Sequence, residues 1–109
     1  MSKIPHELAV FLKNIGVKYV FGIPGGPSIP YMEELKNQNI QFITTANEQS
    51  AAIMADVTGR LTGVPGICHG TYGAGATNLS TGVGEALLDR SPLIAFTTEF
   101  KDEDRGRVI

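Results

Sequence analysis

Short apolar runs alternate with longer helix-like runs along most of the chain, and this alternation limits the possible folds more than any other feature. Runs rich in β-branched residues predict strands, and apolar residues three or four apart predict helices. The predicted strands cover residues 17–21, 40–44, 67–70 and 93–98, and the predicted helices cover residues 5–13, 29–37, 46–61 and 76–88. Strands that alternate with helices form parallel sheets through right-handed crossovers. We therefore expect an α/β fold, a doubly wound parallel sheet with helices on both faces.

The C-terminal end of this sheet is expected to be incomplete. Residues 99–107 form a charged segment without periodicity, and the chain then stops at two apolar residues, Val108 and Ile109. A sheet of four strands would also leave an edge strand uncovered. The length of 109 residues fits one domain. We expect residues 1–109 to be that single domain in a truncated form.

Composition argues against several classes of protein. The formal net charge is −2 and no basic block occurs, so neither nucleic acid nor a membrane is an expected partner. No apolar run approaches the length of a membrane span, and the first residues lack the apolar core of a signal peptide. A single cysteine, Cys68, excludes an internal disulfide and suits a reducing compartment. We predict a cytoplasmic protein in which Cys68 is a small buried hydrophobe.

Two glycine-rich segments, residues 22–27 and 71–75, each follow a predicted strand and precede a predicted helix. Glycine at such a place lets backbone amides approach a ligand closely. Neither segment is a G-x-x-x-x-G-K-[ST] phosphate loop, and Asn78 stands where a G-x-G-x-x-G motif needs its last glycine. Each segment is therefore either part of a ligand site or an ordinary strand-to-helix turn.

One carboxylate, Glu48, lies at the junction between the predicted strand 40–44 and the alanine-rich helix that follows. The carboxyl ends of parallel strands open into a crevice where ligands bind. Glu48 could contact a ligand proton there, or it could be an ordinary acid in the first turn of a helix. His6 and His69 are far apart in sequence, with no Cys or Glu at metal-ligand spacing near them. We predict no metal site within this chain.

Four segments taken together resemble one known family. They are residues 20–26 (VFGIPGG), 47–63 (NEQSAAIMADVTGRLTG), 73–82 (GAGATNLSTG) and 89–95 (DRSPLIA). Their order and spacing resemble the N-terminal pyrimidine-binding (PYR) domain of thiamine-diphosphate-dependent enzymes. The most similar group contains acetolactate synthase, pyruvate oxidase and the 2-keto-acid decarboxylases. Ala74 departs from the pattern of this family, which usually has a proline at that position.

The resemblance implies roles for individual residues. In this family a glutamate at the position of Glu48 hydrogen-bonds N1′ of the cofactor's aminopyrimidine ring and promotes loss of the thiazolium C2 proton. Glu48 is therefore the implied catalytic residue. The residues that match positions next to the cofactor are Pro24, Gly25, Glu48, Thr71 and Asn78. The residues that match positions facing the substrate are Gly26 and Thr71.

The resemblance also implies cofactors and partners. Thiamine diphosphate is bound in this family together with Mg²⁺, through a Gly-Asp-Gly motif on a separate domain, and nothing in this chain resembles that motif. The family's site lies between the PYR domain and the diphosphate-binding domain of a partner subunit. We therefore expect a homodimer or tetramer that acts on a 2-keto acid as a lyase or transferase, by decarboxylation or acetolactate-type carboligation. This chain, as part of a longer or split protein, is expected to be inactive alone.

Two other functions stay open. The chain could be a non-catalytic module with a PYR-like fold, or an unrelated doubly wound nucleotide-binding domain. The presence of Glu48 argues against the first function, because a module without activity does not need it. The lack of a phosphate-loop signature argues against the second.

Overall fold

Helices and strands alternate in the computed structural model, which describes residues 3–99 and 101–104. The helices are α1 (Lys3–Asn14), α2 (Ile29–Asn37), α3 (Glu48–Thr62), α4 (Ala74–Asn78) and α5 (Ser80–Asp89). The strands are β1 (Tyr19–Gly22), β2 (Gln41–Thr44), β3 (Gly66–Gly70) and β4 (Leu93–Thr97). Two short 3-10 helices are η1 (Gly26–Ser28) and η2 (Asp102–Asp104). The charged segment predicted for residues 99–107 is thus described only in part, and Val108 and Ile109 lie outside the described residues.

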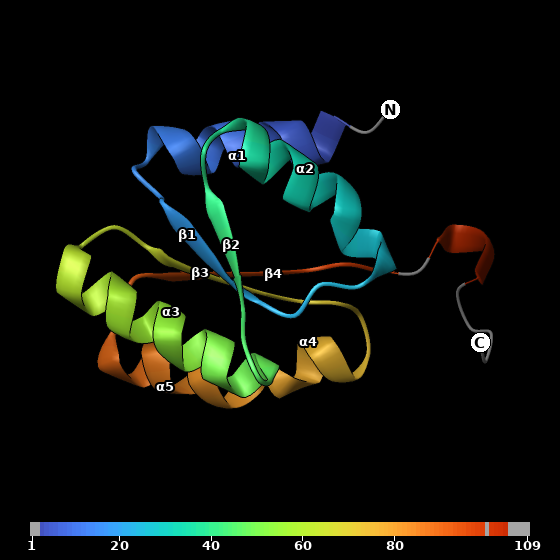
Figure 1. Ribbon diagram of the computed structural model, residues 1–109. Helices are drawn as coiled ribbons and strands as arrows, with labels where there is room; N and C mark the ends of the chain where they lie inside the picture. The colour runs from blue at the N-terminus through green and yellow to red at the C-terminus, as the bar shows by residue number, and fades with distance from the viewer. Residues whose placement is uncertain (1–2, 100, 105–109) are drawn as a thin grey trace.

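The four strands form one parallel sheet in the order β2-β1-β3-β4. The chain runs from β1 outward to β2, returns past β1 to β3, and continues to β4. Helices α1 and α2 cover one face of the sheet, and α3, α4 and α5 cover the other (Figure 1). The prediction of an α/β doubly wound sheet is therefore confirmed. The strand order reverses between β1 and β3, which makes their carboxyl ends the place where such folds bind ligands.

Each face of the sheet has its own hydrophobic core. The core under α1 and α2 consists of Ala9, Leu12, Val17, Val20, Leu35, Ile40 and Ile67. The core under α3 and α5 consists of Phe21, Ala51, Ala52, Ala55, Cys68 and Leu79. Neighbouring residues of β1 and of β3 enter opposite cores because side chains alternate along a strand. The strands are therefore apolar at successive positions, as a sheet covered on both faces requires.

Helix α3 buries its small residues and exposes its large ones. Ala51, Ala52, Ala55 and Gly59 are buried, whereas Ile53 and Val57 are about 39–40% exposed and Leu61 is 81% exposed. Leu87 and Leu88 of the adjacent α5 are also largely exposed. The spacing of Ile53, Val57 and Leu61 therefore marks a helix but not its buried face. Within the described residues, no helix combines the length and apolar character needed to cross a membrane.

The prediction of a single helix over residues 76–88 is wrong in detail, because this segment belongs to two helices that meet at Leu79. The amide of Leu79 bonds to the carbonyl of Ala76, three residues back, so the first helix tightens as it ends. The hydroxyl of Ser80 donates to the carbonyl of Thr77 at 2.7 Å, and the hydroxyl of Thr77 donates to the carbonyl of Ala74 at 3.2 Å. Hydroxyl groups that compete for backbone carbonyls in this way disturb helices. Helix α4 also begins at Ala74, inside the predicted glycine-rich loop.

Two glycines of α5 differ in their surroundings and give a matched test of this packing. A Cβ on Gly82 would collide with Ala52 of α3, whereas nothing lies within 4 Å of a Cβ on Gly84. We expect Gly82→Ala to destabilise the protein by about 1–3 kcal/mol through overpacking. We expect Gly84→Ala to stabilise it by up to about 1 kcal/mol, because alanine is the better helix former. Urea unfolding of both variants measures the difference, and equal shifts would contradict the close contact between α3 and α5.

Candidate functional site

Three segments leave the sheet at one edge, from the carboxyl ends of β1, β2 and β3. The backbone ties them together there: the amide of Thr45 donates to the carbonyl of Gly22 at 3.1 Å, and the amide of Ile23 donates to the carbonyl of His69 at 3.4 Å. These segments contain every residue that the sequence predicts for the site except Asn78, which lies at the end of α4. The fold therefore gathers the predicted residues at the point where the strand order reverses.

Glu48 is the first residue of α3, and its place is determined by the residue before it. Asn47 caps the helix, because its side-chain oxygen accepts a hydrogen bond from the amide of Ser50 at 2.8 Å. The hydroxyl of Thr45 donates to the carbonyl of Asn47 at 2.6 Å and holds the approach to the helix. The predicted helix start at residue 46 is thus two residues early. Glu48 follows a well-defined cap and so projects from a fixed backbone.

The carboxylate of Glu48 is held by a residue from another helix. Its Oε1 accepts a hydrogen bond from Nδ2 of Asn78 at 3.1 Å, although the two residues are 30 positions apart. Glycines make room for it: a Cβ on Gly75 would stand 3.4 Å from Oε2, and a Cβ on Gly70 would stand 3.2 Å from Cγ. Oε2 receives no hydrogen bond from the residues that the structure describes. Glu48 is half-buried, and its Oε2 is therefore available to a ligand.

Gly25 and Thr71 join the site from the other two segments. A Cβ on Gly25 would stand 2.8 Å from Cγ2 of Thr71, and Oγ1 of Thr71 lies 3.1 Å from the place of a Cβ on Gly75. Gly25, Thr71, Gly75 and Glu48 thus lie next to one another at this edge of the sheet. Pro24, which is half-buried, and Gly26 flank Gly25, and nothing lies within 4 Å of a Cβ on Gly26. Gly26 accordingly borders open space at this edge.

This arrangement fits the ring of a flat, polar cofactor. A carboxylate accepts hydrogen bonds, and an amide donor on one oxygen leaves the other oriented toward a ring nitrogen that carries a proton. The glycines beside Glu48 leave a cradle that a single Cβ would begin to fill. N1′ of an aminopyrimidine ring accepts a hydrogen bond from a protonated carboxyl group, and it carries a proton once that proton has been transferred. The residues present are therefore compatible with the pyrimidine half of thiamine diphosphate.

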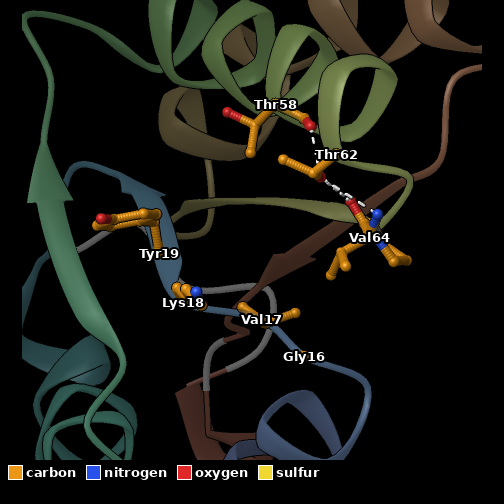
Figure 2. Close-up of a pocket in the computed structure, with 8 residues that line it drawn as sticks. Gly16, Val17, Lys18, Tyr19, Thr58, Thr62 and Val64 are labelled. Carbon is orange, nitrogen blue, oxygen red and sulfur yellow. Dashed lines mark hydrogen bonds between the residues drawn. The ribbon is translucent and has the colours of Figure 1, made fainter.

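A cavity lies away from these residues, at the amino-terminal edge of the sheet. It has a volume of about 200 Å³ and is lined by residues before and at the start of β1 and by the end of α3 and the turn after it. Figure 2 shows Thr58 and Thr62 on one side and Val17, Lys18 and Tyr19 on the other. The hydroxyl of Thr62 donates to the carbonyl of Thr58 at 2.7 Å, so that group is already satisfied. No residue predicted for the site lines this cavity.

A charged cluster between α3 and α5 was not foreseen from the sequence. Asp56 is only 2% exposed, and Arg60 lies 3.4 Å from its Oδ2 and 3.7 Å from Oδ2 of Asp89. Carboxylate oxygens of Asp56, Glu85 and Asp89 come within 4.8 Å of one another. The four-residue spacing of Asp56 and Arg60 was the one available signal. Arg60 neutralises part of this charge, and through Asp89 it links α3 to α5.

His69 lies within a strand, as the predicted strand 67–70 implies. It is fully buried on β3, where Nε2 lies 2.7 Å from the hydroxyl oxygen of Ser28 and Nδ1 lies 2.9 Å from the carbonyl oxygen of Phe96. Burial lowers the pKa of His69 below its usual 6.5, although the hydrogen bond to Phe96 acts in the opposite direction. His6 is on the surface, 3.2 Å from Glu34. The contact between Ser28 and His69 had no local sequence signal, because the two residues are 41 positions apart.

The chain is similar in sequence to known enzymes. Residues 3–108 match the family described as thiamine pyrophosphate enzyme, N-terminal TPP binding domain. A probable acetolactate synthase large subunit of Methanocaldococcus jannaschii is 46% identical over 86 residues, which is 79% of this chain and 15% of that protein. The acetolactate synthase isozyme 2 large subunit of Escherichia coli is 43% identical over 86 residues, or 79% of this chain and 16% of that protein. A probable 2-ketoarginine decarboxylase of Pseudomonas aeruginosa is 38% identical over 91 residues, or 84% and 16%.

We expect Cys68 to be unreactive in the folded protein, as a small buried hydrophobe would be. The residue is 0% exposed, and burial raises the pKa of its thiol to about 12. The thiolate, which is the reactive form, is therefore scarce until the pH approaches that value. Labelling with a thiol reagent at about pH 8 should be undetectable in the native protein and complete in concentrated guanidinium chloride. Equal rates under both conditions would contradict the burial of Cys68.

Proposed function

Because the chain belongs to the thiamine pyrophosphate enzymes, as an N-terminal TPP binding domain, we propose that it forms the pyrimidine-binding half of an enzyme acting on 2-keto acids. Glu48 is its catalytic residue in this proposal. The reaction is decarboxylation or acetolactate-type carboligation, in keeping with the names of the relatives. The chain spans only 15–16% of the length of these relatives, so the remainder of such an enzyme lies on other segments.

The hydrogen bond between Asn78 and Glu48 is the observation that carries this proposal. An acid that only stabilises the first turn of a helix needs no partner from another helix. Glu48 has such a partner, and two glycines, Gly70 and Gly75, leave space around its carboxylate. A group that is held in one orientation and kept open on one side is suited to receive a ligand proton. The geometry thus favours the catalytic interpretation of Glu48 over the ordinary one.

Each residue of the site has a separate task in this proposal. When bound, thiamine diphosphate supplies the electron sink for breaking the carbon–carbon bond of a 2-keto acid. Oε2 of Glu48 holds a proton at the ring nitrogen, while Asn78 fixes the orientation of the carboxylate. Gly25 and Thr71 position the ring, with Pro24 beside them, and Gly26 and Thr71 border the space for the substrate. Positioning and proton transfer are therefore the contribution of this chain.

The second half of the site is proposed to come from a diphosphate-binding domain of a partner subunit, which holds the diphosphate through Mg²⁺. A homodimer or tetramer would bring the two halves together. The exposed leucines of α3 and α5, Leu61, Leu87 and Leu88, give such an assembly apolar surface to cover. The single buried cysteine is in keeping with a cytoplasmic location.

The two other functions are less well supported. An unrelated nucleotide-binding domain does not account for the family match over residues 3–108. A non-catalytic module does not account for the held carboxylate of Glu48. A role as part of a catalytic domain is therefore the better proposal. The effect of replacing Glu48 on activity distinguishes an active module from an inactive one.

Replacement of Glu48 by glutamine tests the catalytic role in an enzyme that contains this chain. The glutamine would keep the size of the side chain but lose its charge and its ability to hold a proton at the ring nitrogen. We expect Glu48→Gln to reduce activity by about 10²–10⁴-fold and to slow exchange of the cofactor's C2 proton by a similar factor. Glu7→Gln, which changes an exposed acid on α1, is the matched control. Unchanged C2 exchange in Glu48→Gln would refute the proposed role.

The need for a second domain is tested with the 109-residue chain alone. Titration calorimetry with thiamine diphosphate and Mg²⁺ should show no binding, because the chain contributes only the pyrimidine half of the site. The complete enzyme, titrated under the same conditions, should bind. Tight binding by the chain alone would contradict the division of the site between two domains.

A further inference from the structure

A buried polar pair, Ser28 and His69, lies directly behind the segment that carries Gly25. Ser28 ends the short helix η1, and His69 is the fourth residue of β3. Both residues are 0% exposed, and the hydroxyl oxygen of Ser28 lies 2.7 Å from Nε2 of His69. The proposed chemistry uses neither side chain. The proposed reaction therefore does not explain why these two polar residues are buried in an apolar core.

The donor and the acceptor of each hydrogen bond around this pair can be assigned in only one way. The carbonyl oxygen of Phe96 can only accept, so Nδ1 of His69 carries the proton of that 2.9 Å bond. In the neutral ring, Nε2 then accepts from the hydroxyl of Ser28, and the hydroxyl oxygen accepts from the amide of Gly25 at 3.0 Å. Every donor in this chain of three bonds has an acceptor. It connects the backbone of β4 to the amide of Gly25.

The surroundings of His69 are apolar enough to make this arrangement rigid. Its ring stacks on Phe96 with 4.3 Å between ring centroids, and meets Phe42 edge-on at 6.1 Å. A buried donor or acceptor without a partner is costly in such a place. Any movement of Ser28 away from His69 would leave both the hydroxyl and Nε2 unpaired. The pair is therefore held at one distance and in one orientation.

The turn of residues 25–28 after β1 needs this anchor because its two glycines contribute no side-chain packing. Gly25 and Gly26 have no side chains to pack, and nothing lies within 4 Å of a Cβ on Gly26. Ser28 closes the turn from both sides: its amide donates to the carbonyl of Gly25 at 2.9 Å, and its hydroxyl accepts from the amide of Gly25. The hydrogen bond to His69 then fixes the closed turn to the sheet.

We propose that Ser28 and His69 are positioning residues, which hold the turn of residues 25–28 against Thr71 and thereby set the shape of the site. The pair touches no reacting atom and acts through Gly25. The effect of the pair on a cofactor rests on the proposed function, whereas its effect on the turn does not.

Three variants separate positioning from simple stabilisation. Ser28→Ala and His69→Phe break the same hydrogen bond from its two ends, and phenylalanine keeps a flat ring against Phe96. Each single change leaves a buried polar group unpaired and should lower stability. The double variant leaves neither the Ser28 hydroxyl nor Nε2 of His69 unpaired, so the part of the loss that comes from their hydrogen bond should be recovered. The carbonyl of Phe96 and the amide of Gly25 still lose their partners, so the recovery should be partial. Thr62→Ala, which removes a hydroxyl at the opposite edge of the sheet, is the matched control.

The first measurement needs no cofactor. Hydrogen exchange, followed by mass spectrometry on peptides that cover residues 22–28 of the complete enzyme, should be about tenfold faster in all three variants. In the double variant this loss of protection should persist although urea unfolding shows partly recovered stability. Wild-type exchange in the double variant would overturn the proposal, and so would a tenfold rise in Thr62→Ala.

The second measurement concerns the cofactor. The concentration of thiamine diphosphate that gives half-maximal activity should rise about tenfold in the double variant, which corresponds to about 1.4 kcal/mol. Faster exchange at residues 22–28 in an enzyme that does not respond to thiamine diphosphate would support the positioning role and contradict the proposed function. An unchanged half-saturating concentration in the double variant, with Glu48→Gln inactive, would overturn the positioning role and leave the proposed function standing.

Discussion

The close approach of α3 to its neighbours is the constraint on which the rest of the structure depends. A Cβ on Gly66 of β3 would collide with the backbone of Ala55, and a Cβ on Gly82 of α5 would collide with Ala52. Helix α3 can lie so near the sheet only because its buried face carries alanine and glycine. This closeness brings the first residue of the helix, Glu48, beside Gly70 at the end of β3. The position of the carboxylate thus follows from packing along the entire helix.

Much of the fold could be predicted from periodicity, and the exceptions have physical causes. The regular spacing of Ile53, Val57 and Leu61 correctly indicates a helix, yet these side chains are exposed, because closeness to the sheet demands small residues there. The break at Leu79 could not be predicted from apolar spacing, since it coincides with hydroxyl groups that bond to nearby carbonyls.

The site was less accessible to sequence reasoning than the fold. Glu48 could be singled out from its place between a strand and a helix, but its partner Asn78 came only from a resemblance to known enzymes. The contact of Ser28 with His69 could not be found at all, because it depends on two strands and a turn that meet only in the folded chain. On the other face of the sheet, the buried carboxylate of Asp56 pairs with Arg60, whose side chain is half-exposed.

The strand order has a consequence for how this domain can assemble. β1 pairs with both β2 and β3, and β4 pairs only with β3. Each strand after β1 therefore pairs with a strand that has been synthesised before it. Gly25, Glu48 and Thr71 emerge in that order, and Asn78 completes the set before β4 has been made. The last strand brings the carbonyl of Phe96 to His69, so the hydrogen bonds behind the site are completed only when β4 joins the sheet.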